Sequence, residues 1–282
     1  MRLKYGAPSM SSSGSKANDS TKRRASVDRP YAESTLSNFL TDNIKRVVRR
    51  EVLDASRAKD KLFGRPRIFN DLLSSQPLCF NVFAELSLDL DLASRALARL
   101  TSGRVSDVTS IDFEHSPGKG DARYTGDRSA FDVFVRYRAP GGKRGFAGIE
   151  VKYHEALGDR PSSHKPRYDE VARTMACFDT ATSSRLRDKP LQQIWRDHLL
   201  AGSLLAAADF DEGFFAFLYP AENERCAKAL EGYRACLTNA ETFETWTLES
   251  LMSAVLEESQ ADWAKAVVDR YLDFGKLDSF EP

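Results

Sequence analysis

Two strand-like segments joined by a short glycine-rich turn constrain this sequence most strongly. Residues 130–138 are rich in β-branched and aromatic side chains, and residues 145–153 have the same character. The connector at 139–143 contains Pro-Gly-Gly, a composition typical of turns. Because side chains alternate between the two faces of a strand, Glu150 and Lys152 share one face. The sequence therefore predicts a β-hairpin that carries an acid and a base side by side.

The register of this hairpin decides whether Asp132 joins Glu150. Directly opposed residues on antiparallel strands share a face, and their position numbers have a constant sum. A turn centred on Gly141 gives a sum of 282 and places Asp132 opposite Glu150. A slip of one residue would put Asp132 opposite Ile149 or Val151 and separate the two carboxylates. The predicted cluster therefore depends on the turn.

Two neighbouring carboxylates repel each other unless a cation neutralises them, and hard oxygen ligands of this kind suit Mg²⁺. A lysine beside them can orient or deprotonate water and offset charge that develops on a phosphate. This combination predicts phosphodiester hydrolysis. The alternative is a solvated ion pair, which a Glu-x-Lys segment forms by chance in many proteins. The acid on the preceding strand and the apolar flanks of both strands favour the catalytic interpretation.

Asp132, Glu150 and Lys152 resemble the signature of the PD-(D/E)xK nuclease superfamily, the restriction-endonuclease-like enzymes. The segments around them, residues 126–132 and 148–153, resemble a bacterial family of that superfamily without an assigned role. The resemblance implies an α/β fold with an αβββαβ core, in which helices flank a mixed central sheet.

The resemblance covers residues 77–274 in the order of elements, and it also implies the chemistry of the site. Asp132 and Glu150 would be ligands of Mg²⁺, for which Mn²⁺ can substitute, and Lys152 would position the attacking water. Phe131 stands where the name-giving proline would be, a departure that does not touch this chemistry.

Two further site residues follow from the order of elements. The superfamily's first core helix often adds a glutamate to the metal site, and the helical region after residue 66 offers Glu85. Glu85 is otherwise a surface acid on an amphipathic helix. The helix after the Glu-x-Lys strand often places a glutamine at the active site, which nominates Gln193, with Gln192 as the other choice. On the apolar face of the same helix, His198 is predicted to be a hydrogen-bonded core residue rather than a catalyst.

Composition divides the chain into three parts. Residues 1–30, rich in Ser, Lys and Arg, are predicted to be a disordered basic tail. Residues 31–76 form a basic helical extension with one helix from about 36 to 62. Residues 77–282 form the nuclease-like domain. Besides the hairpin, its expected strands are 105–113, 213–219 and 242–248, and its expected later helices are 167–179, 191–208, 221–237, 249–256 and 261–274.

The charge is distributed unevenly. Formal net charge is zero, yet residues 1–75 carry 16 Lys and Arg against 8 Asp and Glu, and the rest of the chain carries 25 against 33. In the basic helix, Arg46, Arg49 and Arg50 either lie along a nucleic-acid backbone or face water alone.

The favoured interpretation is a Mg²⁺-dependent nuclease that cleaves DNA rather than RNA. The alternatives are a catalytically inactive nuclease-fold module that binds nucleic acid in a defence or repair complex, and a structural partner protein without a nucleic-acid role.

Other motifs narrow the function further. Four widely spaced cysteines without a CxxC pair predict reduced thiols in a cytoplasmic protein. No apolar run reaches membrane-spanning length, so no membrane partner is expected, and a homodimer is compatible with the sequence. The Gly-Lys-Gly at 118–120 lacks the spacing of a P-loop, and the segment beginning His154-Glu155 lacks the second histidine of a zinc protease. Nucleotide hydrolysis and metalloprotease activity are therefore not expected.

Overall fold

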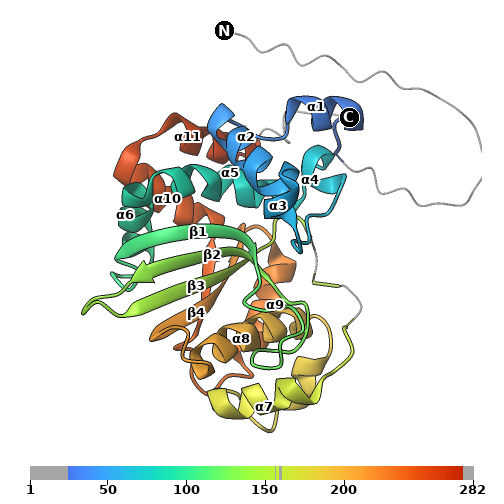
Figure 1. Cartoon of the computed structure of the whole chain (residues 1–282), viewed down its shortest axis with the longest axis vertical. Coiled ribbons are helices and arrows are strands. Elements are labelled where there is room, and N and C mark those ends of the chain that lie inside the picture. Colours follow the sequence, from blue (N-terminus) through green and yellow to red (C-terminus); the bar gives the residue numbers. More distant parts are fainter. Residues whose placement is uncertain (1–24, 156, 159–160, 276–282) are drawn as a thin grey trace, which may run out of the picture.

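A five-stranded sheet forms the centre of the molecule (Figure 1). The computed structural model describes residues 25–155, 157–158 and 161–275. Three antiparallel strands come first, and two parallel strands extend the sheet, so that the spatial order equals the sequence order. The strands are β1 (Asp107–His115), β2 (Phe131–Arg138), β3 (Arg144–Val151), β4 (Glu212–Tyr219) and β5 (Phe243–Thr247). This mixed sheet is the one that the sequence predicts.

Helices cover both faces of the sheet (Figure 1). On one face lie α1 (Arg29–Thr35), α2 (Asp42–Val48), α5 (Ser75–Leu88), α6 (Leu90–Leu100), α10 (Leu248–Ser259) and α11 (Asp262–Tyr271). On the other face lie α7 (Pro166–Met175), α8 (Leu191–Ala206) and α9 (Glu224–Arg234), with the 3-10 helix η2 (Ser183–Arg187) between α7 and α8 in sequence. The predicted α/β architecture is therefore confirmed.

Strand β4 shows why both faces need cover. Its side chains alternate between two hydrophobic cores: Phe214, Ala216 and Leu218 pack on the α5 side, and Phe215 and Phe217 pack on the α8 side. A strand that is buried on both faces appears in the sequence as a continuous apolar run. Residues 213–219 have this pattern, which fixes β4 as a central strand.

The β2–β3 hairpin has the register that a turn centred on Gly141 requires. Val133 pairs with Ile149, and the ladder continues to Arg138 and Arg144. Gly141 and its neighbour in the turn have φ angles of 86° and 80°, in the left-handed region that glycine adopts without a Cβ clash. The turn prediction is therefore confirmed, and Glu150 lies on the β3 face opposite to that of Ile149.

The predicted single helix from 36 to 62 is wrong. The chain instead forms α2, a π-helical turn η1 (Arg49–Leu53) and the short α3 (Ala55–Ala58), and later α4 (Arg67–Asn70). Asp54 accounts for the break, because its extended backbone ends η1 and its carboxylate accepts hydrogen bonds from the backbone N–H groups of Ser56 and Arg57. A side chain of this kind starts a new helix in place of continuing the old one.

The extension belongs to the same core as the sheet. Ala32, Phe39 and Val47 are buried in the hydrophobic core beneath β1 to β4, and the predicted domain boundary at residue 76 falls inside α5. Residues 1–24 of the predicted tail lie outside the described residues. Within the described part, residues 25–30 already join the fold, since Ser26 forms a β-bridge with residue 71 and α1 begins at Arg29. None of the helices in the described part combines the length and apolar character that crossing a bilayer requires.

Candidate active site

Asp132, Glu150 and Lys152 meet where β2 begins and β3 ends. The Lys152 Nζ lies 2.5 Å from Glu150 Oε1, and the side chains of this pair are only 13% and 7% exposed. Asp132 Oδ2 accepts a 2.8 Å hydrogen bond from the backbone N–H of Val151. The backbone pairing of the hairpin ends at Val133 and Ile149. Beyond that pair, the Asp132 side chain itself connects the two strands. The structure thus brings the three predicted residues together.

Burial and mutual charge govern the titration of this group. Burial raises the pKa of the Asp132 carboxyl well above its ordinary range, and the charges of Glu150 and Glu114 raise it further. Burial alone would lower the pKa of Lys152, but the charges of Glu150 and Asp132 outweigh burial and hold that pKa above its ordinary range. Lys152 is therefore an ammonium ion in the metal-free protein.

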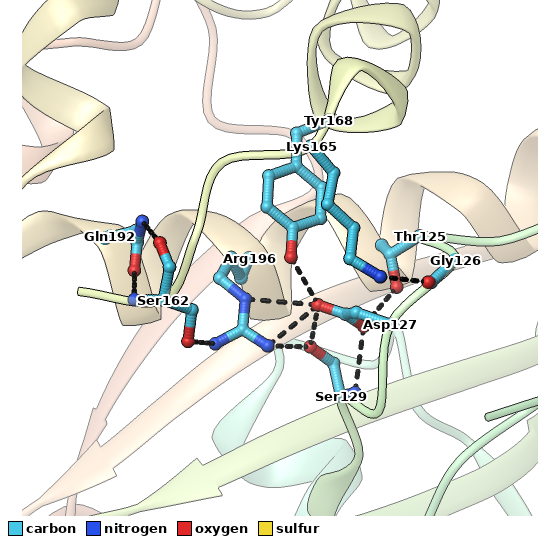
Figure 2. Close-up of polar contacts among 9 residues, drawn as sticks. All are labelled: Thr125, Gly126, Asp127, Ser129, Ser162, Lys165, Tyr168, Gln192 and Arg196. Carbon is cyan, nitrogen blue, oxygen red and sulfur yellow. Dashed lines mark hydrogen bonds and ion pairs between the residues drawn. The ribbon is translucent and has the colours of Figure 1, made fainter. Parts of the chain in front are cut away.

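Helix α8 supplies the glutamine that contacts Glu150. The Nε2 atom of Gln193 donates a 2.5 Å hydrogen bond to Glu150 Oε1. Gln192 points elsewhere: its side chain accepts from the backbone N–H of Ser162 at 2.6 Å and donates to the Ser162 carbonyl at 2.7 Å (Figure 2). Of the two candidates, Gln193 is the one beside the carboxylate. His198 is the core residue that was predicted, because it is fully buried and bonded to Tyr233 and Thr242.

Glu85 is not brought into this group. Its carboxylate accepts hydrogen bonds from Thr41 Oγ1 at 2.5 Å and from Asn43 Nδ2 at 3.1 Å, next to α2. Gln76, which lies nine residues earlier on α5, contacts the acids instead through Glu114. Nine residues are two and a half helical turns, so the two side chains leave α5 on opposite sides. Glu85 is the glutamate of the expected first helix, but the sequence does not show which side of that helix faces the hairpin.

The arginines of the extension lie on the surface. Arg46, Arg49 and Arg50 are all exposed, on α2 and η1. Arg46 Nη2 donates to Asn43 Oδ1 at 2.8 Å, and Arg50 pairs with the buried Glu51 at 2.8 Å. Arg57 and Lys61 contact the same Glu51 carboxylate, so one negative charge faces three cations. A role of the three arginines in binding nucleic acid stays a prediction.

Glu114 is an acid of this site that the sequence does not reveal. It lies near the end of β1 with a φ of 50°, a left-handed conformation uncommon for a side chain of this type. Gln76 Nε2 donates to its Oε1 at 3.2 Å. Burial, followed by the charge of Glu150, raises the pKa of Glu114 to about 7. We call Asp132, Glu150, Glu114 and Lys152 the acid cluster.

Asp197 is a second acid that sequence reasoning missed. It lies one helical turn after Gln193 on α8 and lines a cavity of about 280 Å³ together with Gln193 and Glu150. Burial raises the pKa of the Asp197 carboxyl well above its ordinary range, and the charge of Glu150 is the next cause. Asp197 lies four residues after Gln193, so both side chains share one face of α8. This spacing points to the site only once Gln193 is known to contact Glu150.

A network around Asp127 fixes α8 against the loop between β1 and β2 (Figure 2). Asp127 Oδ2 accepts hydrogen bonds from Arg196 Nη2 at 2.7 Å and from the Tyr168 hydroxyl at 2.6 Å. Its Oδ1 accepts from the backbone N–H of Ser129 at 2.9 Å and from Thr125 Oγ1 at 2.8 Å. Burial opposes ionisation, but these donors and the Arg196 charge hold the pKa of Asp127 well below its usual range. The network therefore holds the helix that presents Gln193 and Asp197.

The donor set of the acid cluster fits Mg²⁺. Among the described residues, no three His, Cys, Asp or Glu side chains stand together as ready metal ligands, and Lys152 neutralises Glu150. Mg²⁺ needs only one or two protein carboxylates, since it completes its shell with water and phosphate. The acids of the cluster outnumber the ammonium of Lys152. Burial, and next the charge of Glu150, raises the pKa values of Asp132 and Glu114. A hard divalent cation would offset the excess of negative charge.

Comparison with known proteins identifies the family. A family model described as the PD-(D/E)XK nuclease superfamily matches residues 2–273. The search of curated proteins and the search of solved structures found no match. The matched region includes the whole acid cluster. The elements α5, β1, β2, β3, α8 and β4 occur in the αβββαβ order, with α6 inserted before β1 and α7 and η2 inserted before α8. The chain therefore belongs to the PD-(D/E)XK nuclease superfamily.

Proposed function

We propose that this protein is a Mg²⁺-dependent nuclease that hydrolyses phosphodiester bonds, in DNA rather than in RNA. The observation that carries the proposal is the contact of Lys152 and Gln193 with one oxygen of Glu150, beside the buried Asp132. A structural ion pair would not need two further acids at the same place, because uncompensated buried carboxylates destabilise a fold. Membership of the nuclease superfamily supports the same reaction class.

Asp132 and Glu150 are the residues that would hold the ion. When bound, Mg²⁺ would neutralise these carboxylates and withdraw electron density from the scissile phosphate. Gln193 would keep Glu150 in one orientation through its hydrogen bond. The ammonium of Lys152 would donate hydrogen bonds to the attacking water and stabilise negative charge that develops on the phosphate oxygens.

Glu114 is the proposed acceptor of the water's proton. A group with a pKa of about 7 is well matched to proton transfer at neutral pH. As the water oxygen attacks phosphorus, its proton passes to Glu114 and the bond to the leaving oxygen breaks. The leaving oxygen takes up a proton from solvent, and Glu114 later returns its proton to solvent. The products are a phosphomonoester and a free hydroxyl group.

The loop between β1 and β2 offers donors for a substrate phosphate. The Lys119 Nζ and the Ser116 Oγ are buried and have no hydrogen-bond partner among the described residues. Burial, followed by the charge of Arg128, lowers the pKa of Lys119, whereas Glu114 opposes that change. The two unpartnered donors, and Arg128, which is exposed and acts on Lys119, are groups that a phosphate can satisfy. The surface arginines Arg46, Arg49 and Arg50 would add contacts that do not depend on sequence.

The test is cleavage by the full chain and by three near-isosteric variants, Asp132→Asn, Glu150→Gln and Lys152→Met. Duplex DNA, single-stranded DNA and RNA are each incubated with Mg²⁺ or Mn²⁺, and circular dichroism checks that the variants are folded. We expect DNA cleavage by the wild type and loss of cleavage in all three variants. A folded wild type without metal-dependent cleavage of any substrate would refute the proposal.

One observation favours a second candidate, a catalytically inactive module that binds nucleic acid in a defence or repair complex. Lys152 and Glu150 form an ion pair with each other, and no set of three ligands is preformed in the described part of the chain. For this candidate, binding survives Asp132→Asn but falls, with a smaller salt slope, when Arg46, Arg49 and Arg50 are neutralised. Salt-independent behaviour of every variant would indicate a structural protein without a nucleic-acid role.

A further inference from the structure

A second hollow adjoins the cavity beside Glu150. Its volume is about 660 Å³, and it lies between α9, the segment from η2 to the start of α8, and the chain that follows β3. The two hollows share Leu157, Lys189 and Pro190 in their walls. Helices α8 and α9 pack against each other in this part of the molecule (Figure 1). A strand that lies in the second hollow can therefore continue through the first to Glu150.

The rim of this second hollow is positively charged. One acid, Asp188, lines it together with four exposed cations, which are Arg185, Lys189, Arg225 and Lys228. We call this hollow the basic groove. Residues 76–282 carry 25 Lys and Arg against 33 Asp and Glu, so their composition alone would favour a negative surface. The excess of positive charge at the basic groove is therefore local.

Most of these cations have no acidic partner. Among the described residues, only Lys228 of the four forms an ion pair, and its partner Glu224 lies 3.5 Å away with the two side chains 78% and 81% exposed. An exposed pair of this kind contributes little to stability. Arg225 and Lys228 are three residues apart on α9, so their charges share one face of the helix and repel each other. The rim thus offers positive charge that a polyanion can neutralise.

The floor of the basic groove is apolar. Leu157, Leu191 and Ala229 line it, and all three are buried. Gly232 adds no side chain to the floor, and a Cβ at this position would lie 3.9 Å from both Arg185 Nη2 and Leu191 Cδ2, so the cationic rim and the apolar floor meet here. Phosphates need the cations alone, whereas the face of a base can pack on apolar side chains. The groove therefore suits a strand that presents both.

We propose that the basic groove binds an unpaired stretch of the substrate strand next to the scissile phosphate. The inference rests on the proposed nuclease function, which places that phosphate at the acid cluster, and it names the substrate class as DNA with a single-stranded segment beside the cleaved bond. A duplex keeps the faces of its bases stacked inside the helix, so only an unpaired strand can bring them to an apolar floor. The volume of the groove lies within the range of about 300 to 1,000 Å³ that is typical of ligand sites.

The test compares two double variants of the full chain, each of which removes one lysine charge and one arginine charge. The groove variant carries Lys189→Gln and Arg225→Gln. The control variant carries Lys143→Gln and Arg138→Gln, at exposed cations beside the hairpin turn, which lies at the opposite end of β2 and β3 from the acid cluster. Fluorescence anisotropy in EDTA, over a range of salt concentrations, measures binding of a labelled single-stranded oligodeoxynucleotide and of the same sequence as a blunt duplex. Thermal melting checks that both variants fold.

We expect the groove variant to bind the single strand more weakly and to reduce the slope of log binding constant against log salt by about 1.4, because each phosphate contact on a single strand contributes about 0.7. The groove variant should bind the duplex as the wild type does, and the control variant should match the wild type on both nucleic acids. An unchanged slope for the single strand, or an equal loss on the duplex, would overturn the inference.

A separate cleavage assay with Mg²⁺ distinguishes this inference from the proposed function. If the wild type cleaves DNA but the groove variant binds the single strand as the wild type does, the inference fails and the proposed function stands. If binding of the single strand depends on the groove but the wild type cleaves no substrate, the proposed function fails and the basic groove remains a binding site for single strands.

Discussion

The substitution Glu114→Gln is expected to make the metal-free protein more stable at about pH 8 while it impairs cleavage. The pKa of Glu114 is about 7 in the fold against an ordinary 4.5, because the carboxyl is buried beside Glu150. One pKa unit corresponds to about 1.4 kcal/mol, so ionisation of Glu114 in the folded protein costs up to about 3 kcal/mol. Glutamine has nearly the same shape, keeps an oxygen that can accept the hydrogen bond from Gln76, and carries no charge.

The sign of this effect depends on pH. Because the folded-state pKa is raised, the penalty is absent below pH 4.5, grows as the pH rises from 4.5 to about 7 and is complete above that value. Urea unfolding of wild type and Glu114→Gln in EDTA, at about pH 5 and about pH 8, measures the difference in the free energy of unfolding. We expect a small difference at the lower pH and a gain of up to about 3 kcal/mol at the higher pH.

Glu85→Gln is the control for this experiment, because Glu85 is hydrogen-bonded to Thr41 and Asn43 away from the acid cluster. We expect no gain in stability for Glu85→Gln at about pH 8 and no loss of cleavage. The reasoning is refuted if Glu114→Gln is no more stable than wild type at about pH 8, or if its advantage is the same at both pH values. If cleavage depends on Glu85 and not on Glu114, Glu85 would be the additional acid of the metal site, as the sequence predicts.

Three further predictions concern neighbours of the cluster. Gln193→Ala is expected to lower kcat by about 10- to 100-fold with little change in stability, because it frees the Glu150 carboxylate to reorient; steady-state kinetics and thermal melting measure the two effects. Lys119→Ala is expected to weaken substrate binding and to reduce the slope of log binding constant against log salt by about one, as for loss of one phosphate contact; an unchanged slope would exclude that contact. Asp127→Asn is expected to lower the free energy of unfolding, measured in urea, by about 3 kcal/mol, since it leaves the Arg196 charge buried without its partner. The control Glu33→Gln, at an exposed ion pair, should change the free energy of unfolding by less than about 1 kcal/mol.

The hairpin could be predicted from the sequence because its information is local. The apolar alternation of two strands and the two glycines of the turn determine a register, and the register determines the faces of Asp132 and Glu150. Gln193 came from the resemblance to the superfamily, which left Gln192 as the other choice, and the packing of α8 against Glu150 decides between the two. Short-range pattern was therefore sufficient for the register that aligns Asp132 with Glu150, but not for the choice of glutamine.

Glu114 and Asp197 could not be predicted because their roles depend on long-range packing. Glu114 reaches the cluster through a left-handed backbone position at the end of β1, which no strand pattern indicates. Asp197 follows Arg196 on α8, where consecutive side chains point in different directions. Only the fold shows that Arg196 turns to Asp127 and that Asp197 lines a cavity with Glu150. Glu85 lies in the expected helix, α5, but on the side that faces Thr41 and Asn43.

The opposite electrostatics of the two clusters around α8 predict how stability varies with pH. Asp127 has a lowered pKa, so its ion pair with Arg196 contributes fully above the ordinary value of 3.8 and is lost as the pH falls below it. Glu114 has a raised pKa, so its penalty appears as the pH rises from 4.5 to about 7. The metal-free protein should therefore be most stable at mildly acidic pH, between these two ranges. Mg²⁺ binds the ionised cluster and should move the maximum toward neutral pH. Thermal melts across pH with and without Mg²⁺ measure the shift, and a maximum that ignores the ion would mean that the acids of the cluster do not bind it.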